Sequence, residues 1–499
     1  MAARWWTLVA VCTGVFMLLL DITIVNVALP DIQRDLDASL ADLQWVIDAY
    51  ALVLAALLLT AGSLADLYGR KRVFVAGVVA FGLGSLLCGL APTILTLTLA
   101  RGAQGIGGAA MFATALALLA AAYSGRERGI AFGAFGAVTG VAVAVGPVLG
   151  GVLTTGLSWR WIFWVNLPIC VGAVVIAWFK VSESKDPNAG RPDWIGFVTF
   201  SAALALLVFG LIDAGLRGWG DPLVVGCLLG AAALLVAFVF SQLREAEPMF
   251  DLTLLRKPTF VGGLVAAFAV SSSIFSLLAY LVIYLQNVLG YSAIGAGLRL
   301  LFLSGASFVA ATIAGRLTAK VPTKWLIAPG FFLLGCGLGL LLLIDADTSW
   351  TVIIPGLLVS GVAIGMINVP LASTAVGVVA VERSGMASGV NSTFRQVGIA
   401  TGIAALGSIF SRVVSSDIAA QLRGTPASSQ SDAIAAAVTG GQIDRVVQMA
   451  PEPFRESLRQ VATVGFVDAL NQITVIASGT AFVAAALCVW LIRQRDFVS

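Results

Sequence analysis

The chain has 499 residues, of which 59% are hydrophobic and only 11% are charged. Water-soluble domains are about 25% charged and about 45–50% apolar, and a soluble core of this size could not hide so much apolar surface, so a wholly soluble fold is excluded. The formal net charge of +3 gives no reason to expect a nucleic-acid partner. The absence of histidine removes the commonest general base and metal ligand.

Fourteen apolar runs are long enough to cross a bilayer, since a spanning helix needs about 20 mostly apolar residues. They lie near residues 6–29, 43–64, 73–91, 93–121, 130–153, 160–179, 194–214, 222–241, 259–285, 294–314, 325–344, 352–374, 386–411 and 463–492. The first run is too long for a signal-peptide core, so we expect it to be retained as a span. The sequence therefore predicts an all-α integral membrane fold with fourteen transmembrane helices.

The basic residues predict the orientation of these spans. With the N-terminus in the cytoplasm, 18 of the 29 Lys and Arg residues fall on inner segments and seven on outer ones. Five of those seven lie in the long loop 412–462, and long loops count little in the positive-inside rule. We therefore expect a multi-pass protein of the plasma membrane with both termini in the cytoplasm, and the long loop as a partly ordered extracellular cap.

A weak internal repeat predicts the domain organisation. Gly62 and Gly77 flank the loop after the second run, and Gly315 and Gly330 flank the loop after the tenth, with the same 15-residue spacing. This fits two six-helix bundles with two helices inserted between them, an arrangement in which the binding site lies where the halves meet. The expected units are an N-terminal bundle (1–180), an inserted pair with its loops (181–258) and a C-terminal bundle (259–499).

Charged residues inside the apolar runs are the first candidates for function, because a charge at mid-bilayer costs at least about 2.5–3.5 kcal/mol. Asp21 lies nine residues before Pro30 at the outer end of the first run, about 13 Å deep. Arg101 lies eight residues after Thr93 in the fourth run, about 12 Å deep by the same rise. We expect the two to pair, either for proton coupling or as a static ion pair that fixes helix packing.

A third intramembrane acid leaves two interpretations open. Asp48 lies five or six residues into the second run, about 8 Å from its outer end. It either shares a cavity with Asp21 and takes part in proton coupling, or it reaches external water.

The segment after the second run carries a signature. Gly62-Ser-Leu-Ala-Asp66-Leu-Tyr-Gly69-Arg70-Lys71-Arg72 resembles the loop between helices 2 and 3 of the major facilitator superfamily. The resemblance implies a gate at the cytoplasmic side, and we expect its parts to be Asp66, Gly69, Arg70 and Arg72. The expected partner of Asp66 is Arg126 or Arg128, which follow the fourth run. The alternative is an ordinary positively charged inner loop.

Further segments, spread over nearly the whole chain, resemble the fourteen-helix drug–proton antiporters of that superfamily. They are Leu20-Asp21-Ile-Thr-Ile-Val-Asn26-Val-Ala-Leu-Pro30, Leu99-Ala-Arg101-Gly-Ala-Gln104-Gly105-Ile-Gly107-Gly108, Gly146-Pro147-Val-Leu-Gly150-Gly151, Trp159-Arg160-Trp161-Ile-Phe-Trp164-Val-Asn166 and Ala387-Ser-Gly389-Val-Asn391-Ser-Thr-Phe-Arg395-Gln396. The resemblance makes Gly146, Pro147, Gly150 and Gly151 an exporter motif, although Ala142 replaces the glycine expected four residues before it. The expected cavity residues are Asn26, Gln104, Asn166, Asn391 and Arg395; Arg395 could instead snorkel to the inner surface.

These observations predict a proton-coupled secondary exporter of amphipathic small molecules such as drugs, antibiotics or dyes. The alternative is a narrow exporter of one endogenous metabolite or self-made antibiotic. No Gly-x-x-x-x-Gly-Lys-Ser/Thr sequence occurs, so the chain carries no such ATP-binding loop. A membrane-embedded enzyme is disfavoured by scattered acids and absent histidine, and we expect no catalytic activity, cofactor or metal. The expected partners are the substrate, protons and the lipid bilayer, with the chain acting as a monomer.

Overall fold

The computed structural model describes residues 2–38, 40–186, 191–245, 247–318, 320–346, 348–424 and 426–497, and this part of the chain is helical with connecting loops and has no strand. The long helices are α1 (Ala2–Leu36), α2 (Leu40–Tyr68), α3 (Arg70–Leu90), α4 (Ile94–Ala122), α5 (Gly125–Gly156), α7 (Asn166–Lys180), α8 (Trp194–Arg217), α9 (Pro222–Arg244), α10 (Pro258–Val270), α12 (Ala293–Leu317), α13 (Lys324–Leu341), α14 (Ile353–Gly377), α15 (Ser384–Gln421) and α18 (Arg455–Leu491). The short ones are α6 (Trp161–Trp164), α11 (Ser276–Ile283), α16 (Ser431–Thr439) and α17 (Ile443–Met449). Within the described residues, 13 helical segments are long and apolar enough to cross a membrane.

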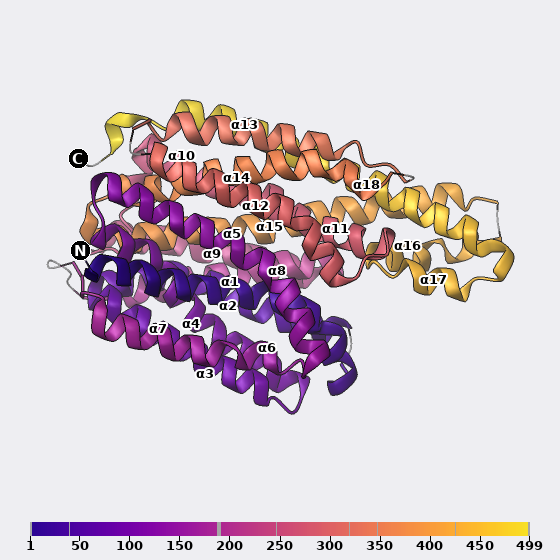
Figure 1. The fold of residues 1–499 in the computed structure, drawn as a ribbon, viewed down its shortest axis with the longest axis horizontal. Helices are drawn as coiled ribbons and strands as arrows, with labels where there is room; N and C mark the ends of the chain where they lie inside the picture. Colours follow the sequence, from indigo (N-terminus) through magenta and orange to yellow (C-terminus); the bar gives the residue numbers. More distant parts are fainter. Residues whose placement is uncertain are drawn as a thin grey trace.

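The long helices lie side by side along the longest axis of the molecule (Figure 1). Both chain termini lie at one end of the bundle, hereafter the termini end. The opposite end, hereafter the cap end, carries α16 and α17, which project from the bundle together with the first part of α18. Short loops reverse the chain direction after each long helix, so consecutive helices are antiparallel. Several of them nevertheless pack on helices further along the chain, as α5 does on α1 and α12.

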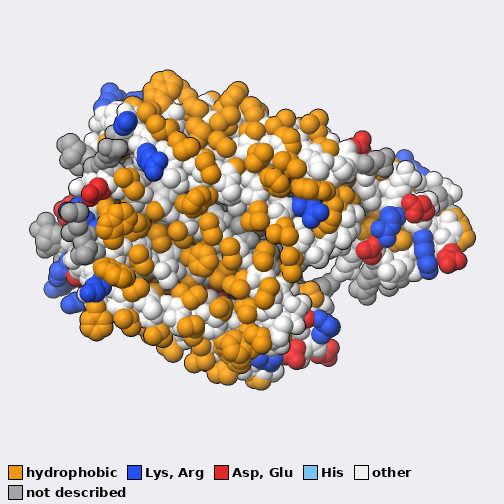
Figure 2. Space-filling model, in the orientation of Figure 1, with side chains coloured by type: hydrophobic (Ala, Val, Ile, Leu, Met, Phe, Trp, Pro, Cys, Tyr) orange, Lys and Arg blue, Asp and Glu red, His pale blue; other side chains and the backbone are white. Residues whose placement is uncertain are grey.

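The surface between the two ends is apolar. Figure 2 shows hydrophobic side chains across the length of the bundle and charged ones gathered toward its ends. Large aromatic side chains are freely exposed on this surface, with Trp178 at 60% and Phe179 at 74% of full exposure. Soluble monomers rarely expose continuous apolar patches of more than a few hundred Å². The protein is therefore a multi-pass membrane protein whose sides face lipid.

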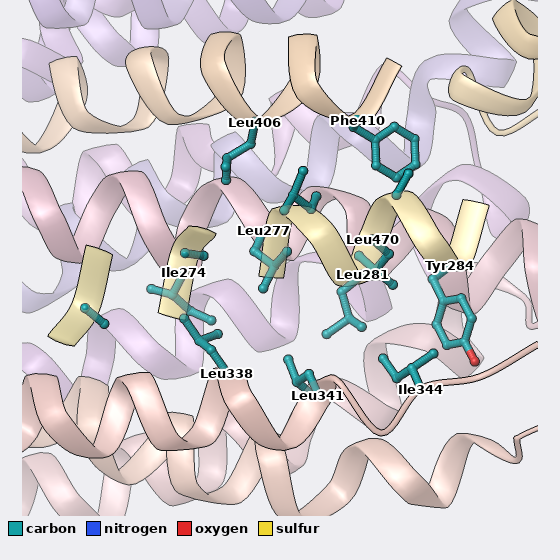
Figure 3. Close-up of a cluster of buried hydrophobic side chains, with 14 of the residues drawn as sticks. Ile274, Leu277, Leu281, Tyr284, Leu338, Leu341, Ile344, Leu406, Phe410 and Leu470 are labelled. Carbon is teal, nitrogen blue, oxygen red and sulfur yellow. The ribbon is translucent and has the colours of Figure 1, made fainter. Parts of the chain in front are cut away.

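Buried apolar side chains form clusters in the N-terminal and C-terminal parts of the chain, and a smaller cluster joins Leu59 of α2 to Phe260 of α10 and Met386 of α15. Two clusters draw mainly on α1 to α7, with Phe74, Phe81 and Phe163 among their fully buried members. A third joins helices from α10 to α18. Figure 3 shows its centre, where Leu277 and Leu281 lie between Leu338 and Leu341 on one side and Leu406 on the other.

Two seams join α1–α7 to the later helices. In the first, α5 packs along α12, with Gly133 against Gly315. In the second, α2 packs along α15, where a side chain at Gly62 would meet the backbone of Gly385. Small residues at both seams allow the helix backbones to approach closely, as is common between membrane helices.

The helices α8 and α9 pack against each other, and α8 lies over the seam between α2 and α15. The rings of Trp45 in α2 and Phe209 in α8 have centroids 5.5 Å apart, and the Thr60 and Ser201 hydroxyls form a 2.9 Å hydrogen bond. At the cap end, the indole of Trp219 donates to the Ser408 hydroxyl of α15 at 2.8 Å. The helix α8 and the loop after it therefore contact both sides of this seam.

Several predicted spans differ in detail from the observed helices. The ninth, expected near 259–285, is interrupted by two π-helical segments, Ser271–Phe275 and Tyr284–Val288. The first π segment packs closely against α15, where a side chain at Gly402 would meet the backbone of Ser272. The thirteenth and fourteenth runs are longer than expected, because α15 continues to Gln421 and α18 begins at Arg455. Much of the predicted loop 412–462 is therefore helix.

Candidate functional site

A buried ion pair lies inside the N-terminal helices. The Asp21 side chain in α1 is fully buried, and Arg101 in α4 is 1% exposed. Arg101 Nη1 donates to Asp21 Oδ2 at 2.5 Å and to Gln104 Oε1 at 2.7 Å, while its Nε donates to the Val46 carbonyl at 3.1 Å. Two charges removed from water in this way are tolerated only when paired and hydrogen-bonded.

Two amides and a hydroxyl complete the surroundings of Asp21. Gln104 Nε2 and Asn166 Nδ2 donate to Asp21 Oδ1 at 2.9 and 3.0 Å. Both amides also donate to the Ser85 hydroxyl of α3 at 2.9 Å. The carboxylate thus accepts hydrogen bonds from an arginine and two amides. The network contains side chains from four helices, α1, α3, α4 and α7. We call Asp21, Ser85, Arg101, Gln104 and Asn166 the buried polar cluster.

Aromatic rings and close helix contacts hold this cluster in place. The guanidinium carbon of Arg101 lies 4.3 Å from the Tyr50 ring centroid and 5.9 Å from that of Phe163. Such stacking stabilises a desolvated arginine by about 2 kcal/mol. A side chain at Gly84 would meet Gln104 at 2.6 Å, so α3 can approach α4 only because that residue is glycine.

The predicted exporter motif lies beside the same cluster. A side chain at Gly146 would collide with Thr23, and one at Gly150 would meet Ile24 at 3.0 Å, so these glycines bring α5 against α1 just beyond Asp21. A side chain at Gly151 would instead meet Ile294 of α12 at 3.1 Å. The side chain of Pro147 lies outside the described part of the structure.

A second network joins α2 to α15 at the termini end. Asp66 Oδ1 accepts from Arg70 Nε and Nη2 at 2.9 and 2.8 Å, and from the backbone N–H of Gly385 at 2.9 Å. Asp66 Oδ2 accepts from the Met386 N–H at 2.7 Å. An aspartate at the first turn of a helix satisfies free N–H groups and interacts favourably with the helix dipole.

Arg70 extends this network to the segment before α15. Its Nη2 donates to the carbonyl oxygens of Val381 and Glu382 at 2.6 and 2.7 Å, and its side chain is 2% exposed. The Asp66–Arg70 pair therefore fastens both sides of the seam between α2 and α15. From the sequence, Arg126 or Arg128 was the expected partner of Asp66. That expectation is wrong for Arg128, which donates to the Ala120 carbonyl, whereas the Arg126 side chain is outside the described residues.

The glycine of the same motif has a specific backbone role. Gly69 has φ of 115°, a conformation that residues with a Cβ rarely adopt, and a Cβ there would lie 2.6 Å from the Glu183 carboxyl carbon. Glu183 accepts from the N–H groups of Lys71 and Arg72 at 3.0 and 3.2 Å and thereby caps α3. The Arg72 side chain is itself 76% exposed, with its Nε 3.8 Å from Glu183, so it lies at the edge of the network.

A small cavity of about 40 Å³ lies between the N-terminal and C-terminal helices. One water needs about 10–15 Å³ on this measure, so the cavity has room for a few waters and not for a drug. Arg395 and Asn391 of α15 line it, together with Asn368 of α14. Arg395 is half-buried and donates to Asn368 Oδ1 at 2.7 Å. The opposite wall is mainly apolar, with Phe112 and Phe135 from α4 and α5, and Thr139 is its polar member.

The remaining predicted residues lie apart from this cavity. Gln104 and Asn166, expected at the cavity, belong to the buried polar cluster. Asn26 is exposed on α1, and Asp48 is half-buried in α2, where it bonds with Gln44.

Sequence reasoning did not identify three residues that belong to these sites. Ser85 and Tyr50 contact the buried polar cluster, and Asn368 is the hydrogen-bond partner of Arg395. The sequence feature that could have identified them is their position, since each is a side chain with a polar group inside an apolar run. Such isolation marks a residue without indicating its partner.

The fold and these sites define a class of protein. A bundle of spanning helices, with a buried acid–arginine pair in one half, a polar seam at one end and a cavity between the halves, is the construction of a membrane transporter. Intramembrane ion pairs of this kind are costly and persist where they serve transport.

Comparison with known proteins identifies the family. Residues 11–403 match the Major Facilitator Superfamily, and the chain belongs to it. The chain is 37% identical over 413 residues to the multidrug resistance protein Stp of Mycobacterium tuberculosis (strain CDC 1551 / Oshkosh), covering 83% of this chain and 77% of that protein. It is 36% identical to the puromycin resistance protein pur8 of Streptomyces alboniger (81% and 82% covered) and 33% identical to a probable actinorhodin transporter of Streptomyces coelicolor (92% and 81% covered).

Solved structures show the same fold at low identity. The human organic anion transporter MFSD10 (TETRAN) superposes with a TM-score of 0.63 at 13% identity, over 97% of this chain and 99% of that one. A bacterial homolog of the human lysosomal transporter Spinster, inward-facing and unoccupied, has a TM-score of 0.56 at 18% identity, over 100% and 99%. These likenesses concern the fold alone.

Proposed function

We propose that this protein is a proton-coupled exporter of amphipathic small molecules, of the fourteen-helix drug–proton antiporter branch, acting as a monomer in the plasma membrane. The observation that carries the proposal is the buried Asp21–Arg101 pair, because a carboxylate with a fixed arginine partner can exchange that partner for a proton. The relatives named for multidrug and puromycin resistance support export as the direction.

The proposed topology has fourteen spans and both termini in the cytoplasm. The 32-residue helix α5 would be the span additional to the 13 that meet the length and apolarity criteria. Basic residues such as Arg70, Lys71 and Arg72 gather at the termini end, which favours the cytoplasm for that end. The proposed units are the bundle 1–180, the inserted pair within 181–258 and the bundle 259–499.

In the proposed cycle, the Asp66–Arg70 network is the cytoplasmic gate. It joins α2 to the N-terminus of α15, so it exists only while the two bundles touch at the termini end. Contacts made in one state alone bias the equilibrium between states by their own free energy. The arrangement described here would be the state with the cytoplasmic side closed, and opening must break this network and enlarge the small central cavity.

In the same cycle, protonation of Asp21 would start the movement that opens the cytoplasmic side. A protonated Asp21 no longer needs the charge of Arg101, and Gln104 and Asn166 can then change their own partners. Because α1 carries Asp21 and packs on α5 through Gly146 and Gly150, a change at the acid reaches a helix that also packs on α12 of the other bundle. We propose that this shared packing links proton binding to the movement of the bundles.

Transport by inside-out membrane vesicles tests the proposal. An imposed pH gradient, acid inside, should drive ethidium accumulation and release protons, and a protonophore should abolish both. Substrate transport at a rate independent of the proton gradient would contradict proton coupling, although the protein would still be a transporter.

The breadth of substrate has a second candidate. A relative with the printed name of probable actinorhodin transporter favours the narrow alternative, export of one endogenous metabolite or self-made antibiotic. Inhibitory concentrations for a panel of dyes and antibiotics, with and without the gene, separate the two. Resistance to chemically unrelated compounds supports a broad pump, and resistance to one scaffold supports the narrow exporter.

A further inference from the structure

The C-terminal wall of the central cavity carries side-chain donors that lack partners. Arg395 has five N–H donors, and its hydrogen bond to Asn368 is the one recorded for it among the described residues. The Asn391 side chain is 2% exposed, and its Nδ2 has no hydrogen-bond partner in this part of the chain. No Asp or Glu is among the residues that line the cavity. The cavity thus presents one positive charge and a free amide donor.

Three other buried or half-buried arginines of the bundle are compensated by an acid or by aromatic rings. Arg101 pairs with Asp21, and Arg70 pairs with Asp66. Arg299 stacks on Tyr291 and Trp350, with its guanidinium carbon 3.4 and 4.7 Å from the two ring centroids. Within the described residues, Arg395 has neither an ion-pair partner nor a ring over its guanidinium. Its charge is therefore available to a ligand.

Arg395 lies at a depth where an unpaired charge costs free energy. Eleven residues separate it from Ser384 at the start of α15, which places it about 16 Å into the bundle and close to the middle of a bilayer about 30 Å thick. A charge at this depth with a single neutral partner is retained where it serves a function. The expectation that Arg395 could snorkel to the inner surface does not fit its bond to Asn368 at this level.

We infer that Arg395 and Asn391 form a subsite for an anionic oxygen group, such as a carboxylate or phenolate, on the transported molecule. The inference rests on the proposed function and adds the chemical class of the substrate. Asn368 orients the guanidinium fork, which matches a carboxylate geometrically. Phe112 and Phe135 on the opposite wall would contact the apolar rings of the same molecule once the cavity widens.

The subsite is tested by binding, which does not depend on proton coupling. The purified full-length protein is titrated with a fluorescent dye that carries one carboxylate and with its methyl ester, and affinity is read by fluorescence anisotropy. The wild type should bind the acid at least about tenfold more tightly than the ester, as expected for hydrogen bonds to a charged group. Arg395→Gln should abolish this preference, Arg395→Lys should keep part of it, and Asn391→Ala should reduce it.

Arg299→Gln is the matched control, because it removes an arginine that lies outside the cavity and should leave the preference unchanged. If Arg395→Gln fails to fold, Arg395→Lys and Asn391→Ala still decide the matter. Equal affinity for acid and ester in the wild type overturns the inference. So does an equal loss of both in the variants, which would mean a structural role for Arg395.

An inorganic anion is the other possible source of the same chemistry. In that case chloride alone should raise the melting temperature of the wild type and not of Arg395→Gln. Without chloride, the wild type should bind the acid dye and its ester equally well. This pair of results also overturns the inference. Failure of gradient-driven transport of the acid dye in vesicles, with the acid preference in binding intact, would remove proton coupling and leave the anion subsite standing.

Discussion

Replacing Asp21 with asparagine removes one charge and changes little else. The shape is preserved, yet Arg101 loses the carboxylate with which it pairs. One of the two oxygens, either Oδ1, which accepts from Gln104 and Asn166, or Oδ2, which accepts from Arg101, becomes an NH₂ donor. Breaking a buried ion pair costs about 3–5 kcal/mol. Asparagine still offers one acceptor, so we expect the lower limit, about 3 kcal/mol, which is more than a hundredfold in any equilibrium that requires the intact cluster.

The expected result is loss of coupling rather than loss of all transport. In vesicles of matched protein content, Asp21→Asn should show no ethidium accumulation against a gradient, while downhill movement persists. Asp35→Asn is the matched control, because Asp35 lies on the same helix and also pairs with an arginine, Arg160, but with its side chain 48% exposed. That variant should transport at near the wild-type rate.

A double substitution separates stability from coupling. Asp21→Asn combined with Arg101→Gln removes both charges, so no buried charge is left unpaired, and it should recover part of the lost stability. It should not recover gradient-driven accumulation. Wild-type accumulation in Asp21→Asn, abolished by a protonophore as in the wild type, would refute the assignment of Asp21 to proton coupling.

Three further predictions concern the charges around the transport path. Arg101→Ala should abolish drug resistance and Arg101→Lys should keep part of it, since lysine retains charge but not the planar fork; full resistance in Arg101→Ala would show that the pair is dispensable. Asp48→Asn should weaken resistance to cationic ethidium more than to a neutral drug, and equal losses would argue against a role in cation recognition. Asp66→Asn should favour the inward-open state at least about tenfold, because it removes the charge that Arg70 and the N-terminus of α15 share. Labelling of single engineered cysteines at each end, in a background without the six native ones, measures this shift, and unchanged rates would reduce the segment to a topology signal.

The depth of charges could be predicted from the sequence because a helix rises by a constant amount per residue. Asp21 and Arg101 fall at one level by counting alone, and the structure places them in contact. Counting could not assign Gln104 and Asn166, which were expected at the cavity and instead bond to Asp21. Counting residues gives the depth of a side chain, but not the rotation of the helix about its axis, so it does not determine which neighbour the side chain faces.

The sequence alone determined that the chain spans a membrane many times, because hydrophobicity is a sum over residues and needs no knowledge of their partners. It also determined the family, since the glycine and charge spacings of the loops lie within short segments. Only the tertiary structure decided which residues meet across helices. Asp66 is satisfied by Arg70 and by N–H groups more than 300 positions later in the chain, and Arg395 donates to Asn368 of another helix. Those partnerships depend on how helices rotate and pack, and packing is decided by the shapes of all the contacting side chains together.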